Sequence, residues 1–354
     1  MTHVFIIPEP HLWDKTFKNR KSYPDEVMGY MQQVMEIISG YEGKRVIIFP
    51  GDIFHRSYGG IDGIITTFNL FKDLNTLTDN NVFSCVGNHE LSFTYNNPFW
   101  IMAEDYTTRY VNLHGLKAFG TMHPGIKVVD ELDIEDIRFL FGHYCRKDLA
   151  DTSGKDLVFI THNSLLEPEI DKYVSDKFGI ESKTEYMHTV GIKNGDGIPV
   201  TEKLKYVFVG HMHTFFGKFN VEENVQGTDL QFLLQYMGSF GRTSISEVNN
   251  VNLARVIPHF AITEDSCDYV PIDFMLKPRE DIVLEQVVLE NAAKAKNIKT
   301  MRQLVETSSF GDTPEQRIDR RLAENPFLLE LFHSVYSNEL NADITDILKE
   351  VDAL

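Results

Sequence analysis

Five short segments of this chain carry His, Asp, Asn or Glu side chains, residue types that bind metal ions and transfer protons. They are Glu9-Pro10-His11, Gly51-Asp52-Ile53-Phe54-His55, Gly87-Asn88-His89-Glu90, Thr161-His162-Asn163 and Gly210-His211-Met212-His213. Most follow a run of apolar residues, such as Val4-Phe5-Ile6-Ile7, that predicts a buried strand. Ligands bind at the carboxyl ends of strands in open α/β sheets. We therefore expect five strands to bring these side chains to one edge of a sheet.

The donor atoms in these segments indicate which metals they would bind. Imidazole, carboxylate and amide donors without a thiolate suit manganese, iron or zinc rather than an iron–sulfur cluster. The predicted donors are Glu9, His11, Asp52, Asn88, His162, His211 and His213. This set exceeds the four ligands of a structural zinc site and suits two ions that share a carboxylate, about 3.5–4 Å apart. Such a pair can clamp a phosphoryl group and convert a bound water into hydroxide.

The order of these segments resembles the calcineurin-like metallophosphoesterase superfamily, whose pattern is D-x-H, G-D, G-N-H-[DE], H and G-H-x-H. The spacing from Asp52 to His55 and the later stretch Tyr236-Met237-Gly238-Ser239 are similar to SbcD-type DNA repair nucleases. The similarity covers roughly residues 3–275. It implies an α/β fold in which a two-layer β-sandwich is flanked by helices.

We expect Asp52 to bridge the two ions, because Gly51 lets the backbone turn there and His55 lies one turn further on. Glu9, His11 and His213 would complete one metal site, and Asn88, His162 and His211 the other. His211 and His213 face the same way if the chain is extended. By resemblance, His89 contacts the phosphate and protonates the leaving oxygen, while His55 positions the scissile group or His89.

Glu9 is the one departure from the family pattern, which has Asp at this position. Pro8 and Pro10 flank Glu9, and its side chain reaches one methylene further than that of Asp. Two alternatives follow. Glu9 binds the first ion after a small backbone shift or with a changed metal preference, or it leaves that site weak.

Two arginines are candidates for phosphate binding, although an arginine is by default a surface residue. Arg56 directly follows the second segment, and Arg242 lies in a Gly/Ser-rich loop near the expected edge. Either guanidinium could hold a phosphate through a bidentate contact.

The rest of the chain provides the elements that position these residues. Helical spacing predicts helices near 24–39 and 62–78, which alternate with strands in a β-α-β-α-β unit of parallel strands. A strand-rich part follows, up to about residue 275. The later strands are expected near 126–129, 137–142, 157–161, 206–210, 231–237, 253–263 and 269–275. We assign 1–275 to the metallophosphoesterase domain and 276–354 to a helical extension, which packs on the body or serves as a partner-docking or capping region.

The formal net charge of −18 limits how the chain could handle a polyanion. A protein that grips DNA alone usually has a basic face, so the charge equally suits an acidic enzyme without a DNA substrate. Cys85, Cys145 and Cys267 are far apart and odd in number, which indicates a reducing, cytoplasmic location. No segment approaches the ~18 apolar residues of a membrane span.

The sequence therefore predicts a two-metal phosphodiesterase, specifically a manganese-dependent DNA exonuclease or endonuclease of SbcD type. A metal-bound hydroxide would attack the phosphorus, and His89 would assist the leaving oxygen. The resemblance also implies a homodimer with an SbcC-type ATPase partner that holds the DNA. Two alternatives remain: a phosphoesterase that acts on small nucleotides or phosphoproteins, and a non-catalytic scaffold with the same fold.

Overall fold

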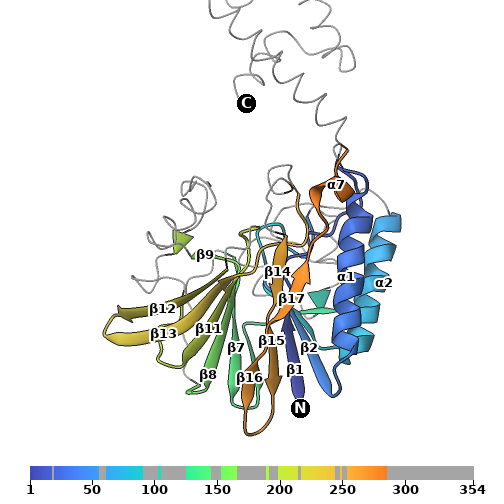
Figure 1. The fold of residues 1–354 in the computed structure, drawn as a ribbon. Coiled ribbons are helices and arrows are strands. Elements are labelled where there is room, and N and C mark those ends of the chain that lie inside the picture. Colours follow the sequence, from blue (N-terminus) through green and yellow to red (C-terminus); the bar gives the residue numbers. More distant parts are fainter. Residues whose placement is uncertain are drawn as a thin grey trace, which may run out of the picture. The chain divides into compact units, whose positions relative to one another are not determined.

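The N-terminal part of the chain alternates strands and helices, as the spacing of its apolar residues predicts (Figure 1). The structure is a computed structural model. It describes residues 1–17, 20–55, 61–90, 103–104, 125–144, 153–165, 189–190, 198–213, 217–243, 248 and 253–284. Predictions that fall on other residues, including the helical extension beyond residue 284, lie outside the described residues.

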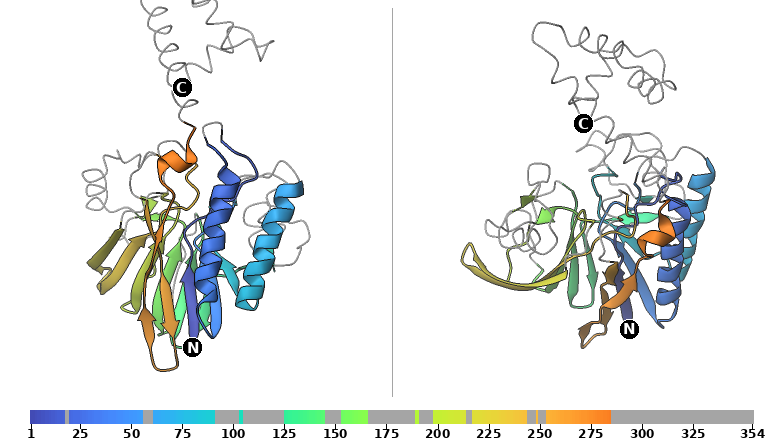
Figure 2. Two further views of the ribbon diagram at one scale, coloured as in Figure 1. Left: turned by 45° about the vertical axis from the view of Figure 1, so that its right-hand side comes forward. Right: turned by 45° about the horizontal axis from the view of Figure 1, so that its top comes forward.

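Two long helices, α1 (Tyr23–Ser39) and α2 (Ile61–Thr78), cover one face of the first sheet. The helix α1 begins at Ser22, whose side chain accepts a hydrogen bond from the backbone N–H of Asp25 and so satisfies a free donor of the first turn. Its buried face follows the helical period through Val27, Tyr30, Met31, Val34 and Ile38. Figure 2 shows both helices on the side of the first sheet that faces away from the second sheet.

The first sheet has the strand order β16-β15-β1-β2-β3-β5-β4. Its strands are β1 (Thr2–Ile6), β2 (Lys44–Phe49), β3 (Val82–Ser84), β4 (Ala103–Glu104), β5 (Ile126–Val128), β15 (His259–Ile262) and β16 (Cys267–Tyr269). The strands β1, β2 and β3 are parallel neighbours, so the segments that follow them leave the sheet at the same edge.

The second sheet has the order β12-β13-β11-β8-β7-β6. Its strands are β6 (Glu131–Ile134), β7 (Ile137–Gly142), β8 (Asp156–Thr161), β11 (Leu204–Val209), β12 (Gly217–Val225) and β13 (Thr228–Tyr236). The strands β7, β8, β11 and β13 run parallel to one another, and β6 and β12 are antiparallel to their neighbours. The apolar pattern of the sequence predicts neither β6 nor β12.

Proline residues divide two strands that the sequence analysis predicts as continuous. Pro258 separates β14 (Ala254–Ile257) from β15, and Pro271 separates β16 from β17 (Ile272–Met275). Proline cannot donate a ladder hydrogen bond, so each strand ends there. The consequence is a change of partner: β14 pairs with β17 in a two-stranded ribbon, whereas β15 joins the first sheet beside β1. The short strands β9 (Ser164–Leu165) and β10 (Thr189–Val190) form another pair.

Two sheets therefore pack as a β-sandwich with helices on one outer face, which confirms the predicted fold class. The apolar layer between the sheets includes Val4 and Ile48 from the first sheet and Phe139, Ile160 and Phe208 from the second. By its internal contacts the chain divides into two compact units, Met1–Val283 and Leu284–Leu354. The short helix α7 (Arg279–Ile282) ends the first unit. Within the described residues, none of the helices is both long and apolar enough to cross a membrane.

Candidate metal centre

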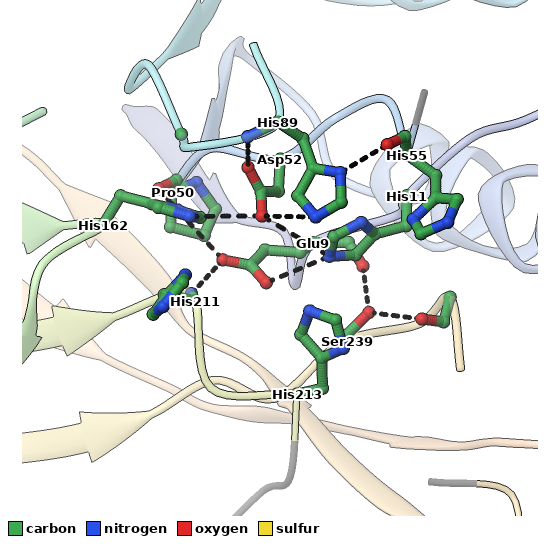
Figure 3. Close-up of polar contacts among 12 residues, drawn as sticks. Glu9, His11, Pro50, Asp52, His55, His89, His162, His211, His213 and Ser239 are labelled. Atoms are coloured by element: carbon green, nitrogen blue, oxygen red, sulfur yellow. Dashed lines mark hydrogen bonds and ion pairs between the residues drawn. The ribbon is translucent and has the colours of Figure 1, made fainter. Parts of the chain in front are cut away.

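The predicted metal donors come from two sheets rather than one, which corrects the expectation of a single sheet edge. Glu9 and His11 follow β1, Asp52 follows β2, and Asn88 follows β3, all in the first sheet. In the second sheet, His162 follows β8, and His211 and His213 follow β11. Both sets of strands end on the same side of the sandwich, so their side chains converge (Figure 3). The donors converge because the strands that carry them are parallel within each sheet and the two sheets pack closely.

One set of side chains, which we name the first donor group, consists of Glu9, His11, Asp52 and His213. Each offers one donor atom, and these four atoms lie within 4.8 Å of one another. Nε2 of His11 lies 3.5 Å from Oε2 of Glu9 and 3.7 Å from Oδ2 of Asp52. The rings of His11 and His213 have centroids 4.4 Å apart. The structure thus brings Glu9 into the group in which the sequence analysis places it.

The second donor group consists of Asp52, Asn88, His162 and His211. Oδ1 of Asn88 lies 3.0 Å from Nε2 of His162 and 2.8 Å from Nδ1 of His211. Nε2 of His162 is also 3.2 Å from Oδ2 of Asp52. Nδ1 of His162 donates to the carbonyl of Pro50 at 2.9 Å, which leaves Nε2 as the donor atom toward a metal. Asp52 belongs to both groups, as a ligand that bridges two ions must.

Unusual backbone conformations and close contacts fix the positions of these side chains. His11, Asp52 and His211 all have positive φ values, of 48°, 46° and 66°, which residues other than glycine rarely adopt. Gly51 has a φ of 116°, and a Cβ there would lie 2.9 Å from Cγ of His162. Backbone strain at three donors is typical of a functional site that the surrounding fold holds in place.

Glu90, to which the sequence analysis assigns no role, joins the loops after β2 and β3. It is fully buried, and its Oε2 accepts hydrogen bonds from the backbone N–H groups of Asp52 and Gly87, both at 2.8 Å. Burial and the charge of Asp52 raise the pKa of Glu90 to about 8, although these N–H donors act in the opposite direction. Glu90 is the last residue of the motif that includes Asn88 and His89, so its position in that motif could have indicated that it has a role in the site.

The charges of the centre are strongly coupled. Burial alone would raise the pKa of Glu9, but the charge of His162 and the ring nitrogens of His11 and His162 beside the carboxylate lower it to about 2. Burial would likewise lower the pKa of His162, but the charges of Asp52 and Glu9 outweigh it and raise that pKa well above the ordinary value. Burial and the charge of His162 lower the pKa of His211 to about 4, so His211 is a neutral donor at pH 7.

His55 and His89 lie beside the first donor group. Their ring centroids are 5.0 Å apart, and that of His89 lies 5.0 Å from that of His11. Nδ1 of His89 donates to the backbone carbonyl of His55, which leaves Nε2 as the ring nitrogen free of that contact. That Nε2 lies 3.9 Å from Oδ2 of Asp52. His89 is partly exposed, whereas His55 is buried.

The predicted phosphate-binding arginines gain no support from their contacts. Arg242 is 1% exposed, and its Nη2 donates to the carbonyl of Lys277 at 2.7 Å and lies 3.3 Å from Oε1 of Glu26. Its side chain is therefore engaged with these residues rather than with the donor groups. Arg56 lies outside the described residues. Phosphate binding by either residue stays a prediction.

The donor groups fit a pair of divalent cations. Oε2 of Glu9, both ring nitrogens of His11 and Oδ2 of Asp52 are buried and make no hydrogen bond to any residue that the structure describes. Such groups are stabilised when they bind a metal. Imidazole nitrogens with carboxylate and amide oxygens suit transition metals such as manganese, iron and zinc. The geometry thus fits a dinuclear site, and it does not determine which metal binds.

Comparison with known proteins identifies one family. The model of the calcineurin-like phosphoesterase family matches residues 10–215. None of the curated proteins matches the chain.

Several solved structures are similar at low sequence identity. A Staphylococcus aureus protein assigned as a 5'-nucleotidase, in complex with alpha-ketoglutarate, is 11% identical with a TM-score of 0.36, over 78% of this chain and 54% of that one. A 5'-nucleotidase precursor from Thermus thermophilus is 11% identical with a TM-score of 0.32, over 84% of this chain and 59% of that one. The calcineurin-like phosphoesterase YfkN from Bacillus subtilis is 11% identical with a TM-score of 0.35, over 78% and 90%. TM-scores this low carry no argument about activity.

Proposed function

Because the chain belongs to the calcineurin-like phosphoesterase family, we propose that it is a two-metal phosphodiesterase that hydrolyses DNA. Family membership and the donor groups together support a metal-dependent phosphoester hydrolase. DNA as the substrate and manganese as the metal are the finer parts of the proposal.

One observation carries the hydrolytic part of the proposal. Two donor groups share Asp52, and Nε2 of His89 lies 3.9 Å from Oδ2 of this shared residue. Two bound cations would lower the pKa of a water molecule and offset the charge that develops on the phosphoryl oxygens. A phosphoester that binds between the groups would place its leaving oxygen near His89.

The side chains of this centre have separable tasks. Asp52 and Glu9 supply negative charge for cation binding, and the carbonyl of Pro50 keeps Nε2 of His162 turned toward Asp52. The carbonyl of His55 accepts from Nδ1 of His89, so that Nε2 is the nitrogen that would pass a proton to the leaving oxygen. Proton donation of this kind typically contributes a factor of ~10²–10⁴ to the rate.

The resemblance of the segment around His55 supports DNA as the substrate. The Asp52-to-His55 spacing resembles SbcD-type nucleases, and the structure places His55 directly against His89 through its backbone carbonyl and its ring. The net charge of −18 favours the second candidate, a phosphoesterase for small nucleotides or phosphoproteins, because an acidic chain repels a polyanion. An SbcC-type ATPase partner that holds the DNA, with a dimer of this chain, would reconcile the charge with a DNA substrate, and we include both in the proposal.

Substrate assays distinguish the candidates. Purified protein with manganese should cleave linear duplex or single-stranded DNA and bis(p-nitrophenyl) phosphate, a phosphodiester, faster than the monoester p-nitrophenyl phosphate. Efficient hydrolysis of cyclic nucleotides or 5'-nucleotides without cleavage of DNA would favour the second candidate. A protein that binds two ions but hydrolyses none of these substrates would indicate a non-catalytic scaffold. Adding the ATPase partner, once identified, should raise the rate on DNA only.

A further inference from the structure

The backbone around Glu9 can donate few hydrogen bonds of its own. Pro8 and Pro10 flank Glu9, and proline has no backbone N–H. The carbonyl of Glu9 accepts from the backbone N–H of Phe240 at 2.8 Å and from the hydroxyl of Ser239 at 2.9 Å. The position of Glu9 therefore depends on the turn that follows β13.

Ser239, in that turn, connects Glu9 with His213, another member of the first donor group. Figure 3 shows the contact of its hydroxyl with Glu9. The backbone N–H of Ser239 donates to the carbonyl of His213 at 3.1 Å, while its hydroxyl lies 2.9 Å from the carbonyl oxygens of both Glu9 and Gly241. The two residues come from the loops after β1 and β11, in different sheets. Ser239 is thus a direct link between the two sheets at the first donor group.

Arg255, on β14, contacts the backbone carbonyls of both Ser239 and His213. It is 3% exposed, and its Nε donates to the carbonyl of Ser239 at 2.9 Å while Nη2 lies 3.4 Å from the carbonyl of His213. Nη1 donates to the carbonyl of Ala254 at 2.8 Å, which fixes the guanidinium to its own strand. Because a guanidinium is planar and its donors diverge at fixed angles, one rigid group sets the spacing of the Ser239 and His213 carbonyls.

We propose that Arg255 is a positioning residue for the first donor group, acting through Ser239 and the carbonyl of His213. This role rests on the proposed two-metal function. In this proposal Arg255 itself binds no substrate and no metal. It keeps the backbones of Glu9 and His213 at the separation that lets both side chains reach one cation, and it ties the β14–β17 ribbon to the centre.

The second donor group has contacts that do not involve Arg255, although the backbone N–H of His211 also donates to Oε1 of Glu9. His162 is fixed by the carbonyl of Pro50, and Asn88 by its contacts with His162 and His211. Loss of Arg255 should therefore weaken one cation and spare the other. A general loss of stability would not separate the two ions in this way.

Titration of the full chain with manganese, followed by calorimetry, tests this role without a substrate. Arg255→Met should lower the affinity for one ion by about tenfold or more, the range typical of residues that orient metal ligands, and leave the other unchanged. Arg255→Lys should be intermediate, because an ammonium cannot span both carbonyls. Arg45→Met is the matched control: Arg45 donates to the carbonyls of Tyr41 and Leu77 at the far end of β2, and both ions should bind it normally.

Two-ion binding by Arg255→Met with wild-type affinities would overturn the positioning role, as would an equal loss of both ions. If Arg255→Met does not fold, Ser239→Ala decides the question, because it removes the hydroxyl contacts with the carbonyls of Glu9 and Gly241 and should weaken the same ion to a smaller degree. Unchanged affinities in Ser239→Ala would then overturn the role. A wild-type chain that binds two ions but cleaves no DNA would refute the proposed function and leave this test intact.

Discussion

The two donor groups share Asp52 but are held in different ways. In the second group, the side chains contact one another: Oδ1 of Asn88 lies within 3.0 Å of both His162 and His211. In the first group, Oε2 of Glu9 and both ring nitrogens of His11 make no hydrogen bond to a described residue. Backbone contacts, including those of Ser239 with Glu9 and His213, hold that group in place.

The first donor group should depend on its metal more than the second. The side chains of the second group are already ordered by their own hydrogen bonds. The first group combines two carboxylates, Glu9 and Asp52, with donor atoms that face one another without hydrogen bonds to described residues, so a cation there offsets more charge and satisfies more buried polar atoms. We therefore expect the two ions to respond differently to changes in the chain.

The largest effect should come from removing the metal from both groups. Excess chelator should abolish phosphodiester hydrolysis, and manganese should restore it better than magnesium, because magnesium prefers oxygen ligands over the four imidazoles present here. Hydrolysis of bis(p-nitrophenyl) phosphate provides the measurement. Full activity in excess chelator would exclude a metal mechanism in either group.

His89 lies outside both donor groups, so a change there should affect the rate and not the metals. His89→Gln removes the titrating nitrogen and should lower turnover by about 10²-fold or more while both ions remain bound. Steady-state kinetics together with metal analysis of the same preparation measure both quantities. If the variant loses an ion, His89 is a ligand and its assignment as proton donor is wrong.

A methyl group on Gly51 should disturb the second donor group more than the first. The Cβ of Gly51→Ala would press on the ring of His162 at a φ of 116°, so the affinity for the second ion should fall by about tenfold. Gly154→Ala is the matched control, since Gly154 also has a positive φ of 70° but meets no atom within 4 Å. Both variants should lose some thermal stability from backbone strain. Equal metal affinities in the two variants would contradict the assigned role of His162.

The smallest effect is expected from Glu9→Asp. The family pattern has the shorter acid at this position, and the carboxylate is retained, so activity should change by only a few-fold. Kinetics at several manganese concentrations would show this as a modest shift in the metal dependence. A loss as large as that in Glu9→Ala would show that the extra methylene of Glu9 is required by this centre.

The sequence predicted the elements that carry the site and most of their order. Apolar periodicity located α1, α2 and the strands that precede Glu9, Asp52, Asn88, His162 and His211. It missed the strands β6 and β12, and it did not resolve how the strands pair. Whether β8 and β11 join the sheet of β1 cannot be read from a local pattern, because both sheets have equally apolar, parallel central strands. The breaks at Pro258 and Pro271 carried a local signal, since proline ends a ladder.

The composition of the site was partly predictable. Motif spacing grouped the seven metal donors, and the structure brings them together, although their roles as ligands stay predictions. Glu90 had a signal in its motif, whereas the link from Arg255 through Ser239 to Glu9 joins residues far apart in the chain. Only the three-dimensional arrangement could reveal it, because no spacing rule connects an arginine on β14 with a carbonyl after β1.

Metal titration of Glu9→Ala and Asn88→Ala tests the central claim, a two-ion centre in which each donor group holds one cation. By calorimetry with manganese, the wild-type chain should bind two ions. Glu9→Ala should weaken one ion and keep the second on Asp52, Asn88, His162 and His211. Asn88→Ala should weaken the other and keep the first. A single ion in the wild type, or unchanged stoichiometry and affinity in Glu9→Ala, would contradict the account.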